Sequence, residues 1–249
     1  MDKQSPEQCL SSVLLLDDGS LLARFGMPGE KGQVLRIDRH GVVPVIGLTH
    51  FGRCPQRRYF ALANAEGVRI TDGWDGPQVT RLAWPTGLEN LPRGYPFEPF
   101  DLPPTPTTLV PFPDGQRVLL VSAEGIFLLA SEGTTRLLPR QVQIVEALAT
   151  GMDPDDIDLG LSMAQGAVSP DGRLIMVGEQ NSPHLVLNEQ LEVIGEIATG
   201  SEQPLMVDGC QLHDSCMLGK AYACLRAHAE ADEVRQALLW KDWQSALAC

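Results

Sequence analysis

The sequence predicts an all-β protein built from a repeated four-stranded unit. Two stretches, Thr107–Pro139 and Ala164–Ile197, share the same order of turns and apolar runs. Each has an apolar lead, a Pro-Asp-Gly turn that begins at Pro113 or Pro170, and then a run of four apolar residues. Proline and glycine favour tight turns between antiparallel strands, and a run without polar residues is typical of a strand covered on both faces. The two copies therefore indicate sheets that stack face to face.

Small sheets repeated in series are the sequence signature of a β-propeller. Propeller repeats of about 40–50 residues allow five or six blades in 249 residues, and 24 glycines and 19 prolines supply the turns. Pro-Asp-Gly turns also occur in sandwiches and barrels, but the shared order of all four strands favours the propeller. We expect one β-propeller domain over residues 1–249, with about five or six four-stranded blades.

The expected elements follow in chain order. The blades are predicted near 12–47, 58–84, 107–139, 164–197 and 205–226. An insertion at 140–162 has helical spacing near 141–149, and a C-terminal helix is predicted over 230–248 from the spacing of Val234, Leu238, Trp243 and Leu247. The proline-rich residues 85–106 exclude a central strand, which leaves a packed connection or a partner-binding loop.

The charge and the cysteine content limit which partners and which cellular compartment we expect for this protein. The net charge of -13 argues against nucleic acid as a partner, and -12 of it lies in residues 141–249. This acidic part either keeps the protein soluble or docks a basic partner protein. Six cysteines are few for a disulfide scaffold, and neither a secretory pattern at Met1–Pro6 nor a membrane-spanning run occurs. We expect a cytoplasmic protein with free thiols and no membrane partner.

Four aspartates in the insertion are the predicted partner-binding residues: Asp153, Asp155, Asp156 and Asp158. A calcium loop of the EF-hand type needs an oxygen ligand at its fifth position and glycine at its sixth. Counted from Asp153, those positions hold Ile157 and Asp158, so the motif fails. A calcium site of looser geometry stays an alternative.

A second cluster offers soft metal ligands: Cys210, His213, Cys216 and Cys224. Zinc could use such a set, but the usual Cys-x2–4-Cys pair is missing, and buried thiols are the alternative. The adjacent His213-Asp214-Ser215 does not form a catalytic triad, because neighbours on an extended chain face opposite ways. Nucleophile-elbow, zincin and phosphate-loop motifs do not occur either. The sequence therefore predicts no catalytic, metal-binding or cofactor-binding residue.

The segments Ser169–Leu174 and Phe112–Val118 resemble the strand and turn of WD40-like and YVTN-like propeller repeats, and Leu16–Gly19 does so loosely. The chain departs from true WD repeats, because no Gly-His pair opens a blade and Trp74-Asp75 lies in a glycine-rich turn. The resemblance implies a platform that binds proteins without catalysis.

Three functions remain after these exclusions. The first is a non-enzymatic protein-binding propeller, an acidic docking module whose specific version is an immunity-type protein that neutralises a basic partner. The second is a propeller enzyme, either a metal-dependent lactonase or a glycosidase-like hydrolase, which bound calcium would favour. The third is a subunit of a larger assembly. The acidic balance and the missing catalytic motifs favour the first.

Overall fold

The structure is a computed structural model that describes most of residues 10–138 and parts of 149–212. The described ranges are 10–26, 32–87, 106–122, 125–138, 149–151, 164–178, 184–197, 205–207 and 210–212. Their secondary structure consists of four four-stranded antiparallel sheets and one two-stranded sheet. The prediction of an all-β protein built from small repeated sheets is confirmed for this part of the chain.

Each four-stranded sheet is an up-and-down meander in which consecutive strands pair. The first sheet comprises β1 (Leu10–Leu15), β2 (Leu21–Phe25), β3 (Gln33–Asp38) and β4 (Gly41–Pro44). The second comprises β5 (His50–Arg53), β6 (Tyr59–Asn64), β7 (Gly67–Asp72) and β8 (Gln78–Leu82). The third comprises β9 (Thr108–Pro111), β10 (Val118–Ser122), β11 (Gly125–Ala130) and β12 (Gly133–Leu137). The fourth comprises β13 (Gln165–Val168), β14 (Leu174–Gly178), β15 (His184–Asn188) and β16 (Val193–Ile197). A hairpin of β17 (Leu205–Val207) and β18 (Cys210–Leu212) follows.

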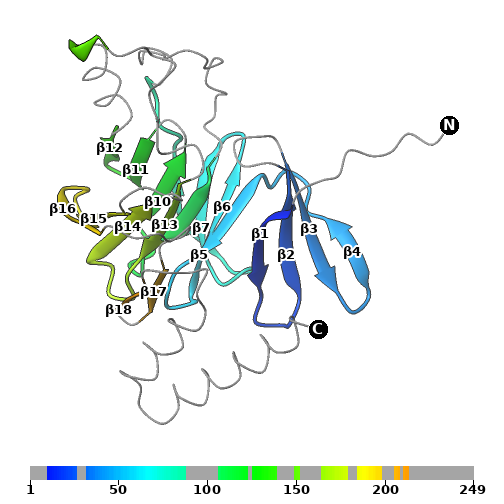
Figure 1. The fold of residues 1–249 in the computed structure, drawn as a ribbon. Coiled ribbons are helices and arrows are strands. Elements are labelled where there is room, and N and C mark those ends of the chain that lie inside the picture. Colours follow the sequence, from blue (N-terminus) through cyan, green and yellow to red (C-terminus); the bar gives the residue numbers. More distant parts are fainter. Residues whose placement is uncertain are drawn as a thin grey trace.

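The sheets succeed one another in space as they do along the chain (Figure 1). The first strands of the second, third and fourth sheets lie side by side, with β9 between β5 and β13. The approach of β5 to β9 is so close that a side chain at Gly52 would meet the carbonyl oxygen of Leu109. The first sheet stands at one end of the series, next to β5 and β6 (Figure 1).

The repeated Pro-Asp-Gly turns have one geometry. Gly115 and Gly172 lie in the left-handed region, with φ of 68° and 74°, which glycine adopts without steric cost. The backbone N–H of Phe112 donates to the carbonyl of Arg117 at 2.8 Å, and that of Ser169 donates to the carbonyl of Leu174 at 2.9 Å. The expected hairpin turns between the first two strands of the third and fourth sheets are confirmed.

The second sheet begins earlier than the predicted 58–84, because β5 at His50–Arg53 precedes it. Its first turn, Cys54-Pro55-Gln56-Arg57, has the same hydrogen bonds, from the N–H of Cys54 to Tyr59 and from that of Arg57 to Cys54. Arg57 occupies the position of the glycine, with φ of 64°. The prediction missed this turn because Gln-Arg replaces Asp-Gly, and it missed β5 because four residues with one large apolar side chain give no strand pattern.

Three hydrophobic clusters fill the spaces between neighbouring sheets. Leu22 and Phe60 belong to the cluster of the first and second sheets, Ile70 and Leu120 to that of the second and third, and Leu119 and Ile175 to that of the third and fourth. All five residues of β10 are buried, as its apolar run predicted. The described sheets therefore stack as propeller blades do.

The predicted helices fall almost wholly outside the described residues. Only Ala149 and Thr150, at the end of the helix predicted near 141–149, are described, and they have helical backbone. The C-terminal helix over 230–248 and the part of the fifth blade after Leu212 lie outside the described residues. Within the described ranges, no helix is long and apolar enough to cross a membrane.

Candidate interaction surface

The predicted site residues lie mostly beyond the described ranges. Asp153, Asp155, Asp156 and Asp158 belong to the connection between β12 and β13, outside the described residues. Of the four residues considered as soft metal ligands, only Cys210 is described, as the first residue of β18; His213, Cys216 and Cys224 are not. The described residues contain no cluster of three or more histidine, cysteine, aspartate or glutamate side chains that could hold a metal ion.

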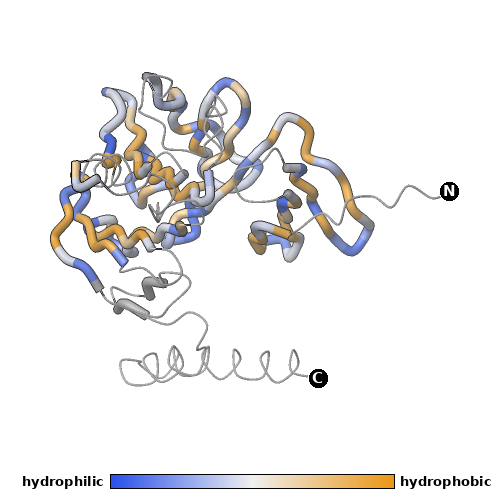
Figure 2. Tube along the Cα trace, turned by 45° about the horizontal axis from the view of Figure 1, so that its top comes forward, coloured by the Kyte–Doolittle hydropathy of each residue, from blue (hydrophilic) through white to orange (hydrophobic). Residues whose placement is uncertain are grey.

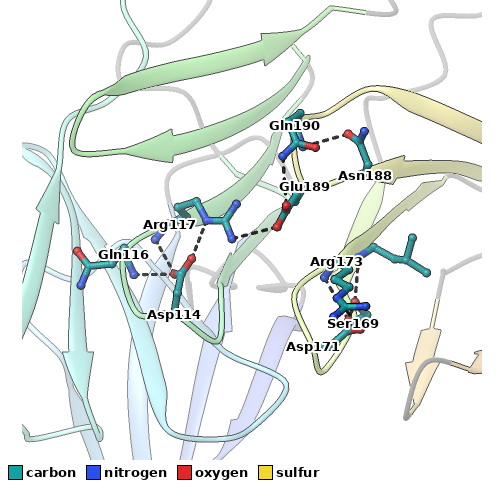
Figure 3. Close-up of polar contacts among 10 residues, drawn as sticks. Asp114, Gln116, Arg117, Ser169, Asp171, Arg173, Asn188, Glu189 and Gln190 are labelled. Atoms are coloured by element: carbon teal, nitrogen blue, oxygen red, sulfur yellow. Dashed lines mark hydrogen bonds and ion pairs between the residues drawn. The ribbon is translucent and has the colours of Figure 1, made fainter.

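The Pro-Asp-Gly turns use their aspartates to fix their own backbone (Figure 3). The carboxylate of Asp114 accepts hydrogen bonds from the backbone N–H of Gln116 at 2.8 Å and from Nε of Arg117 at 2.6 Å. The carboxylate of Asp171 accepts from the Ser169 hydroxyl at 2.6 Å, and this bond is the main cause that lowers the pKa of Asp171. These aspartates therefore stabilise turns and are already engaged.

Further polar contacts at this end of the sheets link one sheet to another. Arg53 on β5 pairs with Asp17 in the first turn at 2.5 Å, and this hydrogen bond is the largest cause that lowers the pKa of Asp17. Arg117 approaches Glu189 of the fourth sheet at 3.7 Å (Figure 3). The side-chain amide of Gln56 donates to the carbonyl of Pro170 at 2.9 Å. At this end of the sheets, ion pairs and a hydrogen bond therefore connect turns and strands of different sheets.

The described sheets carry little net charge. They contain eleven arginines, no lysine and twelve carboxylates, a net charge of -1. Because the whole chain has a charge of -13, a charge of -12 lies in the remaining residues. The acidic character that the sequence predicted for a docking surface therefore belongs to residues outside the described ranges.

Two polar side chains are buried near the junction of the first and second sheets. The guanidinium of Arg24, 2% exposed, donates to the Ser11 hydroxyl at 2.7 Å and to the carbonyl of Thr49 at 3.2 Å. His50 is also buried, and neither of its ring nitrogens has a hydrogen-bond partner. Burial, with a contribution from the charge of Arg24, lowers the pKa of His50 to about 3. The imidazole is therefore neutral at neutral pH.

Five of the nine exposed large apolar side chains among the described residues lie in the first sheet. Residues that pair directly across antiparallel strands point to the same face. The strand registers place three cross-strand rows on one face: Leu15–Leu21–Ile37–Val42, Val13–Ala23–Leu35–Pro44, and Leu10–Phe25–Gln33. We call this surface the open face. Ten of its eleven positions are apolar and none carries a charge.

The large side chains of the open face are exposed or half-buried, although the small Ala23 within it is buried, whereas Leu22 and Val34 on the opposite face are buried. Val13 and Leu15 on β1 are each 53% exposed, and Val42 on β4 is 59% exposed. The opposite face contributes Leu22 and Val34 to the cluster shared with the second sheet. Figure 2 shows hydrophobic segments along the strands of the first sheet at one side of the molecule. Among the described sheets, the second sheet covers one face of the first sheet.

The sequence held a signal for this surface. All four strands of the first sheet have apolar residues on both faces, which predicts a sheet between two layers. The pattern does not show that the sheet ends the series, because that depends on which elements fold around it. The open face was therefore missed as a candidate site.

No family model matches the chain, and no curated protein matches it in sequence. Among solved structures, the β-propeller domain of Cps50 (Swd1) from Myceliophteria thermophila is similar, at 13% identity and a TM-score of 0.47, over 82% of this chain and 60% of that chain. A chain of the mitotic checkpoint complex is similar at 11% identity and a TM-score of 0.43, over 82% and 58%. BamB from Moraxella catarrhalis is similar at 15% identity and a TM-score of 0.43, over 79% and 52%.

This chain thus spans between 52% and 60% of the length of these solved structures. Within the described residues, the fold consists of four-stranded antiparallel sheets that resemble β-propeller blades.

Proposed function

We propose that this chain is a non-enzymatic protein-binding propeller that docks a basic partner protein through acidic segments outside its sheets. The observation that supports it is the separation of charge along the chain. The described sheets hold a net charge of -1 and engage many of their carboxylates in ion pairs and turns, whereas the remaining residues hold -12. A surplus of carboxylates attracts a cationic protein, and a field of one sign accelerates its association.

Asp153, Asp155, Asp156 and Asp158 are the residues we assign to the contact, because they place four carboxylates within six residues. In its specific form, the proposal is an immunity-type inhibitor that neutralises a basic protein in the cytoplasm. Complementary charge would give such an inhibitor rapid association, which matters most when the partner must be captured before it acts.

The test is an affinity capture from the soluble extract of the native host at low salt, with retained proteins identified by mass spectrometry. The variant carries Asp153→Asn, Asp155→Asn, Asp156→Asn and Asp158→Asn. A matched control neutralises four exposed carboxylates of the described sheets, by Asp75→Asn, Glu132→Gln, Glu192→Gln and Glu196→Gln. Both variants change the net charge by the same amount.

We expect wild type and the control to retain the same basic protein, and the aspartate variant to lose it. If all three proteins retain the same set, or if the control loses the partner equally, charge at 153–158 has no specific role and the docking proposal is wrong.

A further inference from the structure

We propose that the open face of the first sheet is the docking site for residues 236–248 of the same chain, which pack on it as an amphipathic helix. These residues fall within the helix predicted over 230–248 and lie outside the described ranges. The contact is separate from the acidic docking proposed above and involves none of its aspartates. It gives the first sheet the second cover that apolar residues on both of its faces predict.

The open face calls for an occupant that is apolar and uncharged. Its three rows belong to none of the hydrophobic clusters between the described sheets. Burial of apolar side chains is favourable in proportion to the area removed from water, whereas an ionised group placed against them is costly. The occupant must therefore present an apolar side without charges.

Residues 236–248 have such a side. Positions three or four apart are neighbours on a helix, so this segment has an apolar row with polar residues opposite it. The row comprises Leu239, Trp240, Trp243 and Leu247. Lys241 and Ser245 fall on the opposite side. Because the row carries no charge and includes two large aromatic side chains, it complements the open face.

The helix and the sheet also match in size. Residues 236–248 make a helix about 20 Å long and about 10 Å wide. The four strands of the first sheet, about 4.8 Å apart, make a face about 15–20 Å across, on which successive rows lie about 7 Å apart. One helix laid across the strands therefore covers two rows, those that contain Leu15 and Val13.

The area of the face favours a tethered segment over a separate molecule. Four strands of about six residues give a face of roughly 300–400 Å². A contact of this size buries less than the total of about 1,200–2,000 Å² that stable complexes between separate proteins bury. A segment of the same chain meets the face at an effective concentration in the millimolar range, so a small apolar contact is sufficient to hold it.

The connection is long enough to reach the first sheet. Strand β18 ends at Leu212, so residues 213–235 lead from it to the segment. An extended chain of that length spans about 75 Å. Neighbouring sheets stack about 10 Å apart, so five sheets in series extend over about 40 Å. The connection therefore reaches the open face even where part of it is folded.

Adjacent residues of β4 provide a matched pair of probe positions. Val42 lies on the open face and is 59% exposed, whereas Val43 pairs with Arg36 on the opposite face and is 62% exposed. The photo-crosslinking residue p-benzoylphenylalanine, in place of one or the other valine, therefore probes the two faces from the same strand. Because both positions are exposed, both proteins should fold, which circular dichroism would verify.

The experiment is photo-crosslinking of the purified full chain at about 1 µM, far below the effective concentration of a tethered segment. Mass spectrometry of the digested products identifies the residues that are joined. We expect the probe at position 42 to join residues 236–248 of the same chain. The yield should be at least about tenfold higher than from position 43, because successive side chains of a strand point to opposite faces.

A second matched pair tests the apolar row of the segment. Trp243→Asp places a carboxylate in the row, whereas Ser245→Asp places one on the opposite side of the helix. We expect Trp243→Asp to lower the crosslinking yield from position 42 by about tenfold or more, because a carboxylate among apolar side chains weakens the contact. Ser245→Asp should keep the yield within about twofold, as substitutions away from a contact do.

The inference is overturned if the probe at position 42 joins two chains, joins other residues of its own chain, or joins nothing. Equal yields from positions 42 and 43 would overturn it as well, as would equal losses in Trp243→Asp and Ser245→Asp. The variant at Asp153, Asp155, Asp156 and Asp158 should leave the crosslink unchanged, so loss of acidic docking and loss of this contact are told apart.

Discussion

His50 gives the clearest prediction at the scale of one residue, because it is buried without a hydrogen-bond partner for either ring nitrogen. Burial lowers its pKa from 6.5 to about 3. Between these values the unfolded chain holds a proton that the folded chain does not, so stability falls as pH decreases from 6.5 toward 3. The limiting slope is about 1.4 kcal/mol per pH unit, and this contribution is constant above about pH 7.5. Urea unfolding between pH 4.5 and 7.5 would measure the slope.

Replacement of the imidazole should remove that dependence on pH. His50→Gln is expected to flatten the free energy of unfolding against pH over this range, whatever its effect at pH 7.5. Ser122→Ala is the control, because its buried hydroxyl also lacks a hydrogen-bond partner but does not titrate. It should change stability by the same amount at every pH. A slope that persists in His50→Gln would assign the pH dependence to other groups.

At the scale of elements, the turns carry contacts between sheets as well as reversing the chain. Gly115 packs beneath the ring of Tyr59 on β6, where a β-carbon would lie 2.8 Å from Cζ of the tyrosine. Gly115→Ala should therefore destabilise the fold twice over, by about 1–2 kcal/mol for a left-handed alanine and by about 1–3 kcal/mol for overpacking. Chemical denaturation of the purified protein measures the sum.

Gly19→Ala is the matched control for that substitution. Gly19 occupies the equivalent turn of the first sheet with φ of 81°, and nothing lies within 4 Å of the added carbon. Gly19→Ala should therefore lose only the stability that a left-handed alanine costs, about 1–2 kcal/mol. In a Tyr59→Ala background, the extra loss at Gly115 should disappear. Equal losses at Gly19 and Gly115 would show that the contact with Tyr59 has no energetic role.

Elements could be predicted from the sequence where local chemistry and tertiary packing agree. The sequence of the Pro-Asp-Gly turns favours one backbone conformation, and the apolar run after each turn must be buried on both faces. Both signals agree, so β10 and β14 were predicted correctly. The strand β5 was missed because its position depends on contact with β9 through Gly52, which has no side chain. Arg57 was missed as a turn residue because arginine gives no sequence signal for the positive φ that it adopts. Such positions are decided by neighbours distant in the sequence.

At the scale of the whole molecule, the sequence predicted the sign of the charge but not where the surfaces lie. The net charge of -13 is a property of composition, whereas its separation from nearly neutral sheets emerges only when the strands are placed. The open face likewise depends on the position of the first sheet at the end of the series. The four aspartates of the predicted site lie outside the described residues, so their role stays a prediction.

The proposed acidic docking should weaken as salt is added, because it rests on attraction between opposite charges. Raising the salt from 50 to 500 mM shortens the screening length from about 14 to about 4 Å. We expect capture of the basic partner to weaken by about tenfold or more.

Surface plasmon resonance on the captured partner would measure this effect. The control variant with Asp75→Asn, Glu132→Gln, Glu192→Gln and Glu196→Gln should retain salt-sensitive capture, whereas the variant at Asp153, Asp155, Asp156 and Asp158 should lose it at every salt concentration. Capture that keeps its dissociation constant between 50 and 500 mM salt would contradict docking through charge.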